Sequence, residues 1–319
     1  MDKNFKQITT FYDHLSNAAI QQNLPLDVVI ESAASWGVQG VEMDYALLEQ
    51  EGPALAHKLA FLGLPINCCY CHFDWANHPE DTSYIKVLEN LREARVNNML
   101  VIPGFADGTF LSRVFPDAAA TDAENAQLTD GEHAPDMSPE KVDLSDISRL
   151  PIEVQNIALC RARELMLPNM IHLLEKAKEY HINVLMEDYD DLPAPFATAE
   201  QVKWFLDRLP DLGCAFDTGN FLYSEEDVID AYELLKSRIK YVHCKDRSFT
   251  PVDGEEPKST VLRRQMYSAA TGSGIIPMKT IIAMLKRDGY EGTYAIEHFG
   301  SVNQYRDIKR SAEFMKKNL

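Results

Sequence analysis

Four short segments in the second half of the chain each end on a residue type that binds metal ions. They read VLMEDYDD (184–191), CAFDTGN (214–220), YVHCKDRS (241–248) and YAIEHFGS (294–301). In each segment an apolar, strand-like run stops on a potential ligand. The four ligands are Glu187, Asp217, His243 and Glu297. Three carboxylates and one imidazole suit Mn²⁺, Mg²⁺ or Co²⁺, and Zn²⁺ is also compatible with them. The pattern predicts one site for a divalent metal ion.

Such a site forms only if the four strands that carry these residues end at the same edge of one sheet. Strand candidates recur along the whole chain, at 7–11, 39–43, 66–72, 98–102, 183–187, 213–217, 239–244 and 293–297. Most are short apolar runs, which are typical of parallel strands covered on both faces. Eight strands alternating with helices predict an α/β fold, a (β/α)₈ TIM barrel, whose active sites lie at the carboxyl ends of the strands.

Helix signals fill the stretches between these strands. Helices are expected at 25–36, 81–96, 155–180, 198–209, 224–237, 277–288 and 303–317. Thr198 followed by Gln201 has the spacing of a capping box. Pro168 is expected to kink or divide the helix over 155–180. An open, doubly wound sheet is the alternative fold, but no G-x-G-x-x-G follows the first strand.

The segment 104–150 interrupts the alternation of strands and helices. It is rich in Asp, Glu, Pro, Ala and Thr, and it leaves from the end of the fourth strand. Loops of this length in a compact barrel are usually functional or disordered. We expect a lid or an oligomer arm here, with a mobile, non-functional insertion as the alternative. The whole chain, 1–319, is expected to form one TIM-barrel domain carrying this insertion.

Composition excludes several classes of partner. The net charge is 31 − 49 = −18, so nucleic acid and anionic membrane surfaces are not expected partners. No apolar run reaches the length of a membrane span, and the first residues carry no apolar signal core. The six cysteines show no zinc-binding spacing and are expected to be free thiols in a reducing cytoplasm. A homo-oligomer is possible.

Six motifs appear in an order that resembles one known family, the xylose isomerase-like barrels of sugar phosphate isomerases/epimerases. They are GVQGVEMD (37–44), LMED (185–188), FDTGN (216–220), YVHCKD (241–246), TGSGIIP (271–277) and IEHFGS (296–301). Relatives in that family include ketose 3-epimerases, hydroxypyruvate isomerase and inosose dehydratase. The resemblance implies that the same four ligands hold one divalent metal ion. It also implies that Glu187 and Glu297 are the catalytic acid/base pair, moving a proton beside a carbonyl through an enediolate.

The chain departs from the epimerase pattern at several positions. Asn220 stands where epimerases often have a histidine, and Arg247 falls at a slightly different spacing after His243. The stretch DYDDLPAP (188–195) lacks the second glutamate of epimerases. The expected function is a metal-dependent isomerase or epimerase of a small ketose or related carbonyl compound. A dehydratase of the inosose type and a catalytically silent sugar-binding barrel stay open. The further metal ligands of the family's apurinic endonuclease branch are absent.

Substrate contacts are predicted for six residues at the same rim: Glu42, His72, Trp75, Asn220, Lys245 and Arg247. Lys245 follows His243 by two residues and so shares its strand face, whereas Cys244 should point away. An internal salt bridge is the alternative role for Lys245. Trp75 would stack on a sugar face, with core packing as its alternative. Gly272 and Gly274 would let backbone N–H groups approach a phosphate.

Overall fold

The computed structural model describes residues 7–116 and 143–319. Eight parallel strands form its central sheet: β1 (Ile8–Phe11), β2 (Gly40–Asp44), β3 (Ile66–His72), β4 (Asn98–Ile102), β5 (Asn183–Met186), β6 (Gly213–Asp217), β7 (Ile239–Ser248) and β10 (Thr293–Glu297). Each strand pairs with the next, and β10 pairs with both β1 and β7, so the sheet closes into a barrel. The predicted (β/α)₈ barrel and all eight predicted strands are confirmed.

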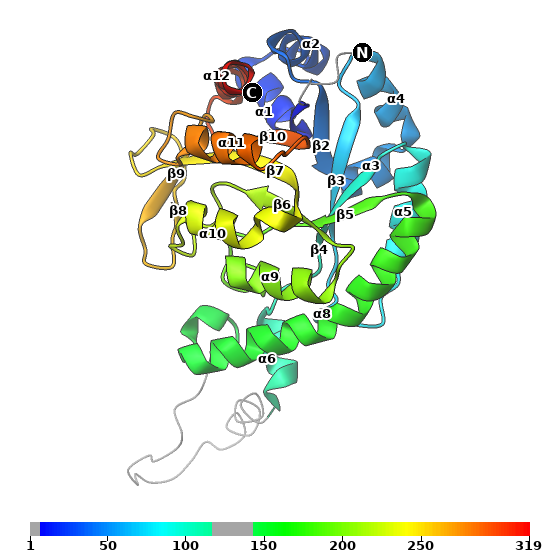
Figure 1. Ribbon diagram of the computed structural model, residues 1–319, viewed down its shortest axis with the longest axis vertical. Coiled ribbons are helices and arrows are strands. Elements are labelled where there is room, and N and C mark those ends of the chain that lie inside the picture. The colour runs from blue at the N-terminus through cyan, green and yellow to red at the C-terminus, as the bar shows by residue number, and fades with distance from the viewer. Residues whose placement is uncertain (1–6, 117–142) are drawn as a thin grey trace, which may run out of the picture.

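Helices surround this barrel (Figure 1). They are α1 (Tyr12–Gln22), α2 (Leu26–Trp36), α3 (Tyr45–Glu51), α4 (Pro53–Phe61), α5 (Tyr84–Glu93), α6 (Gly108–Val114), α8 (Ile152–Tyr180), α9 (Ala199–Arg208), α10 (Val228–Leu235), α11 (Met278–Arg287) and α12 (Gln304–Asn318). Short 3₁₀ turns lie at Ile147–Arg149 and Lys236–Arg238. The capping box at Thr198 is confirmed. Pro168 does not divide the helix, because α8 continues through it; the alternative, a kink at Pro168, stays a prediction.

Among the helices of the described residues, four have no counterpart in the sequence predictions: α1, α3, α4 and α6. The first of them shows why. It follows β1 directly, and Phe11 at its N-cap position makes no side-chain capping bond, so no start signal marks it. The short α6 lies inside the segment 104–150, close to β4. The greater part of that segment, 117–142, lies outside the described residues, and so does the predicted lid or oligomer arm.

Side chains inside the barrel alternate with side chains that face the helices. Along β7, Tyr241 belongs to a small cluster within the barrel, whereas Val242 and Cys244 belong to the large core between barrel and helices. Because successive strand residues point to opposite faces, His243 and Lys245 share the inner side. The expectation that Cys244 points away from His243 is therefore confirmed. All six cysteines are free, and Cys160 alone among them is partly exposed.

A short antiparallel ribbon extends the barrel wall after β7. Strand β9 (Gln265–Ala269) pairs with the end of β7, and β8 (Lys258–Ser259) pairs with β9. Figure 1 shows this ribbon projecting from one side of the barrel. The sequence analysis did not foresee it, and it forms one wall of the cavity described below. Among the described residues, no helix is long and apolar enough to cross a membrane.

Asp246 ties the loop after β9 to the barrel. Its carboxylate accepts hydrogen bonds from the backbone N–H groups of Arg247 (2.9 Å), Gly272 (2.9 Å), Gly274 (2.9 Å) and Ile276 (3.0 Å). The prediction that Gly272 and Gly274 offer N–H groups to a phosphate was wrong, since Asp246 already holds both. Gly274 is also required here, because a Cβ at this position would lie 2.2 Å from Asp246 Oδ1.

Replacing this carboxylate should loosen the loop. We expect Asp246→Ala to lower the free energy of unfolding by about 3 kcal/mol, because several buried N–H groups lose a charged acceptor. Urea denaturation followed by circular dichroism measures the change. Asp253→Ala, at an exposed position between β7 and β8, is the control. A loss below about 0.5 kcal/mol for Asp246→Ala, the usual range for surface changes, would contradict this role.

Candidate metal centre and substrate cavity

The four predicted ligands come together at the carboxyl ends of adjacent strands. Glu187 follows β5 directly, Asp217 and Glu297 end β6 and β10, and His243 lies within β7. One ligand atom from each residue lies within 4.8 Å of the others, and all four side chains are buried. This arrangement depends on the closed barrel, which brings β10 next to β7. The cluster is consistent with a site for one divalent metal ion.

His243 presents its two ring nitrogens to different groups. Nδ1 lies 2.7 Å from Glu187 Oε2 and 3.3 Å from Glu297 Oε2, so it faces the cluster. Nε2 lies 3.1 Å from Oε2 of Glu42, a completely buried carboxylate. In metal sites a carboxylate on the outer nitrogen of a histidine orients the ring and sets its tautomer. Glu42 therefore lies behind the imidazole, where it can orient His243 toward a metal.

Asp217 provides an oxygen suited to a cation. Its Oδ1 accepts backbone N–H groups from Gly219 and Asn220, both at 2.7 Å. Its Oδ2 is buried and, among the described residues, has no hydrogen-bond partner, although Lys245 Nζ lies 3.6 Å away. A buried carboxylate oxygen without a partner is costly unless a cation or a donor meets it. The donor set of the cluster thus fits a divalent ion.

Electrostatics in the cluster also favour a bound cation. Burial raises the pKa of Glu187, and it raises the pKa of Asp217 to about 7 although Lys245 acts against this. Burial has the same tendency at Glu297, but Lys245 and His243 hold the pKa of Glu297 well below its usual range. Carboxylates gathered away from water repel one another, and a divalent ion between them would remove that cost.

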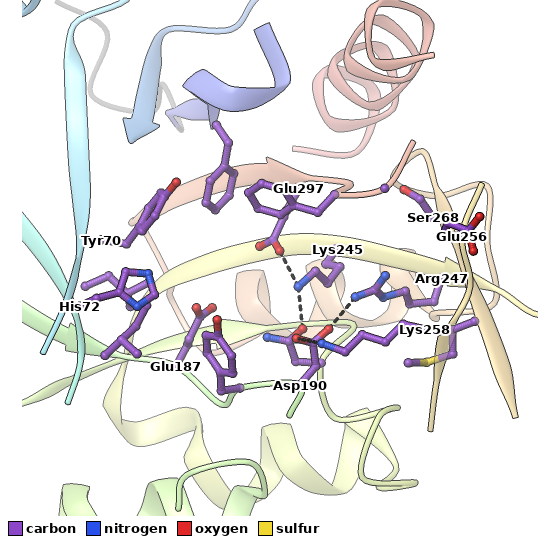
Figure 2. A pocket seen from close by; sticks show the side chains of 18 residues that line it. Tyr70, His72, Glu187, Asp190, Lys245, Arg247, Glu256, Lys258, Ser268 and Glu297 are labelled. Atoms are coloured by element: carbon purple, nitrogen blue, oxygen red, sulfur yellow. Dashed lines mark hydrogen bonds and ion pairs between the residues drawn. The ribbon is translucent and has the colours of Figure 1, made fainter. Parts of the chain in front are cut away.

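Lys245 and Asn220 lie directly beside the ligands. Lys245 Nζ donates a hydrogen bond of 2.6 Å to Asn220 Oδ1 and forms an ion pair with Glu297 (Figure 2). Asn220 Nδ2 donates in turn to the backbone oxygen of Asp188 at 2.8 Å. The alternative role of Lys245, an internal salt bridge, is confirmed; Lys245 also lines the cavity, and its contact with substrate stays a prediction.

A cavity of about 410 Å³ opens above the cluster. One wall is aromatic and includes Phe11, Tyr70 and Phe299. The opposite wall is charged, and Figure 2 shows Asp190 there, bonded to both Arg247 and Lys258. The cavity has the mixed apolar and polar lining of small-molecule sites. Four of the six predicted substrate contacts line it: His72, Asn220, Lys245 and Arg247.

The other two predicted contacts lie elsewhere. Trp75 has an exposed fraction of 0% and stacks on Phe73 with ring centroids 4.3 Å apart, within the core outside the barrel. The loop after β3 turns it there, because the backbone N–H of Trp75 donates to the carbonyl of Pro103 beyond β4. The packing alternative therefore describes Trp75, and its stacking on a sugar was the wrong expectation. Glu42 lies beneath His243 rather than at the cavity surface.

Several cavity residues were missed by the sequence analysis. Tyr70 precedes His72 by two residues on β3, so strand alternation alone could have found it; its hydroxyl donates to Asp13 at 2.8 Å. Asp190 was noticed only as a departure from the epimerase pattern. Lys258 and Ser268 belong to the ribbon after β7, and no motif marks them.

Glu42 offers a direct test of how the metal centre is built. We expect Glu42→Gln to weaken Mn²⁺ binding by about 10–100-fold, because His243 loses the carboxylate that orients it. Competition with a fluorescent chelator measures the affinity. Glu49→Gln, at an exposed glutamate paired with Lys86, should leave the affinity unchanged. Equal Mn²⁺ affinity in wild type and Glu42→Gln would show that the carboxylate has no such role.

Fold and site together define a class of protein. The chain is a TIM barrel whose mouth carries a buried Glu/Asp/His/Glu cluster, consistent with a metal site, under a cavity of small-molecule size. Residues 30–318 match the family of xylose isomerase-like TIM barrels, and the chain belongs to that family. The family resemblance inferred from the motifs is thus confirmed.

Curated relatives of this chain include inosose dehydratases. Inosose dehydratase 2 of Bacillus cereus is 27% identical over 131 residues, which cover 40% of this chain and 43% of the relative. Inosose dehydratase of Lacticaseibacillus casei is 31% identical over 111 residues, covering 31% and 37%. The chain therefore spans less than half the length of the curated relatives it matches.

Solved structures of similar fold include ketose 3-epimerases. D-psicose 3-epimerase from Clostridium cellulolyticum H10, crystallised with D-tagatose, has a TM-score of 0.62 at 13% identity, covering 98% of this chain and 99% of that one. D-allulose 3-epimerase from Methylomonas sp., in complex with D-allulose, has a TM-score of 0.61 at 14% identity, covering 98% and 97%. At these low sequence identities, the structural similarity shows that this chain shares their fold. The named relatives thus include epimerases and dehydratases.

Proposed function

We propose that this protein is a metal-dependent isomerase or epimerase that acts on a small ketose or related carbonyl compound. The observation that carries the proposal is the placement of Glu187 and Glu297. Figure 2 shows the two carboxylates reaching the cavity from different strands, one after β5 and one at the end of β10. Proton removal and proton return beside a carbonyl require two such groups, or one group that reaches both carbons.

Each residue of the site has a role in this proposal. Glu187, Asp217, His243 and Glu297 would hold the ion, and a divalent metal supplies Lewis acidity toward a carbonyl and its neighbouring hydroxyl. Glu187 takes the proton from the adjacent carbon. Glu297 returns a proton from its own side. Lys245 places an ammonium group beside the developing negative charge on the substrate.

A dehydratase is the second candidate, and one specific observation favours it. The Lys245 ammonium lies next to Glu297 within the cavity, where it can donate a hydrogen bond to the oxygen of a leaving hydroxyl. In that reaction a glutamate takes the C–H proton, the C–O bond on the next carbon breaks, and the hydroxyl leaves as water with the proton that the glutamate took up. The curated relatives named above, both inosose dehydratases, support this candidate. Both candidates share the first proton transfer.

One experiment tests both candidates. The Mn²⁺-loaded protein is incubated with ketoses, keto acids and inososes in D₂O, and products are followed by NMR and mass spectrometry. We expect deuterium on the carbon beside the carbonyl of at least one compound. A product that keeps its composition apart from the deuterium indicates an isomerase or epimerase, and loss of water indicates a dehydratase. Binding without deuterium exchange and without loss of water in any compound would overturn both candidates and favour a silent sugar-binding barrel.

A further inference from the structure

The backbone leaves the barrel sheet where β10 presents Glu297 to the ligand cluster. Its pairing with β1 ends at Ile296, and its pairing with β7 ends at Glu297. Within the described residues, the backbone after Glu297 therefore has no neighbouring strand to bond with. The next residue, His298, is buried, and a buried N–H or C=O without a partner costs free energy. Its backbone groups need partners from outside the sheet.

Two buried side chains from neighbouring helices supply these partners. The backbone N–H of His298 donates to Nε2 of His14, on α1, at 3.0 Å. The backbone oxygen of His298 accepts from Nε2 of Gln304, on α12, at 3.0 Å, and from the N–H of Ser301 at 3.3 Å. His14 is 0% exposed and Gln304 is 1% exposed, so water does not compete for these bonds. The peptide that links Glu297 to His298 is thus bonded to His14.

The imidazole of His14 makes this bond in one form only. Because an N–H donates to Nε2, that nitrogen offers its lone pair, and the ring is neutral with its proton on Nδ1. Burial lowers the pKa of His14 well below its usual range, and the neighbouring His298 adds to this effect. The position of His14 in the core therefore keeps it an acceptor.

The same ring also supports a wall of the cavity. It stacks on the ring of His298, with centroids 4.6 Å apart, and meets the ring of Phe299 edge-on at 4.5 Å. Phe299 lines the cavity. His14 is therefore in contact with both residues that follow Glu297, one through its backbone and ring and the other through its ring.

We propose that His14 is a positioning residue for the metal centre, because its Nε2 fixes the backbone immediately after Glu297 and so keeps that carboxylate directed at the cluster. Glu297 lies between two cations: one oxygen is 3.3 Å from His243 Nδ1, and the other forms an ion pair with Lys245. A backbone that is free at this point lets the carboxylate turn toward Lys245 and away from the other ligands.

This inference rests on the proposed function for one point, the part that Glu297 plays in proton transfer. A displacement of about 1 Å at a reacting group can lower a rate by about 10²-fold. His14 acts on that position through the backbone, and it adds to the site a residue that is neither a candidate ligand nor part of the cavity lining.

Two substitutions separate the acceptor from the packing of the ring. His14→Gln keeps an acceptor near the place of Nε2 and loses the aromatic ring, whereas His14→Phe keeps a ring and loses the acceptor. We expect His14→Phe to weaken Mn²⁺ binding by about tenfold, as for other groups that orient a ligand, and to slow deuterium exchange by about tenfold or more. His14→Gln should stay within about threefold of the wild type in both, because the hydrogen bond is kept. Chelator competition and NMR in D₂O measure the two quantities.

Amide hydrogen exchange reports the proposed bond directly, without metal or substrate. In peptides that cover 294–301, the amide of His298 should exchange slowly in the wild type and in His14→Gln, and fast in His14→Phe. His172→Phe, at an exposed histidine on α8, is the matched control and should resemble the wild type in all three measurements. If the larger ring prevents folding, His14→Leu takes the place of His14→Phe, since it also lacks the acceptor.

A histidine that only fills the core predicts a different order. His14→Gln would then lower the melting temperature more than His14→Phe, and neither variant would change Mn²⁺ affinity. Wild-type Mn²⁺ affinity in His14→Phe would overturn the positioning role. Equal losses of affinity in His14→Phe and His14→Gln would overturn it as well.

This inference and the proposed function fail in different ways. Deuterium exchange that proceeds in the wild type and is unchanged in His14→Phe keeps the function and removes the positioning role. No exchange and no loss of water in the wild type, with Mn²⁺ binding weakened in His14→Phe alone, keeps the positioning role and removes both candidate reactions. A wild type that binds no Mn²⁺ would overturn the metal centre together with the role of His14.

Discussion

Glu297→Gln should lower the rate of deuterium exchange into the substrate by about 10³-fold, within the range of 10²–10⁴ typical of a lost general acid or base. Glutamine has nearly the same size, but its amide cannot take up the proton that the carboxylate carries. Glu297 is also a candidate metal ligand, so the comparison is made at saturating Mn²⁺. NMR in D₂O measures the rate, and fluorescent chelator competition confirms that the variant is loaded.

Glu256→Gln is the matched control for this prediction. Glu256 lines the same cavity but is exposed and lies outside the ligand cluster. Its replacement should leave the exchange rate within about twofold, because an exposed carboxylate at the rim is screened by water. Exchange at the wild-type rate in metal-loaded Glu297→Gln would remove Glu297 from the acid/base pair. It would leave Glu187 as the remaining candidate base.

Asp217→Asn should abolish the stabilisation of the protein by Mn²⁺. A ligand that binds only the folded state at 100 times its dissociation constant adds about 2.7 kcal/mol of stability. The wild type should therefore melt several degrees higher with Mn²⁺ than with EDTA. The variant should show almost no difference, because its amide lacks the charge that Asp217 Oδ2 offers to a cation.

Stability without metal separates loss of binding from loss of folding. In Asp217→Asn the side-chain oxygen can still accept the N–H groups of Gly219 and Asn220, so the metal-free variant should unfold within about 1 kcal/mol of the wild type. Asp211→Asn, at an exposed aspartate paired with Lys178, is the control and should keep the full Mn²⁺ effect. An undiminished Mn²⁺ effect in Asp217→Asn would place the metal elsewhere.

Much of the barrel could be predicted because its signals are local. In this chain an apolar run of four to seven residues between two helical stretches forms a strand, and the run can be recognised without knowing which residues pack against it. The ligands followed from the same logic, since a polar residue that ends such a run lies at the carboxyl edge of the sheet. Strand alternation then separated Lys245 from Cys244 correctly.

The positions of residues in loops could not be predicted in this way, because the path of a loop depends on tertiary contacts that sequence spacing does not encode. Trp75 follows β3 and would reach the mouth if the chain continued straight. Instead its backbone bonds to Pro103, and the indole turns into the core. Lys258 lies in the segment between β7 and β9, whose sequence carries no recognisable motif. Only the pairing of β8 with β9 brings its side chain to Asp190.

The sequence by itself determined the strands, their parallel order and the chemical identity of the four candidate ligands, because strand periodicity and side-chain type are properties of each short segment. The tertiary structure alone decided how those groups meet. Glu42 and His243 lie 201 residues apart in the chain, yet their side chains are 3.1 Å apart because the barrel closes. Such contacts form only when distant strands and loops pack together, and they decide which groups lie against the candidate metal ligands and which side chains line the cavity.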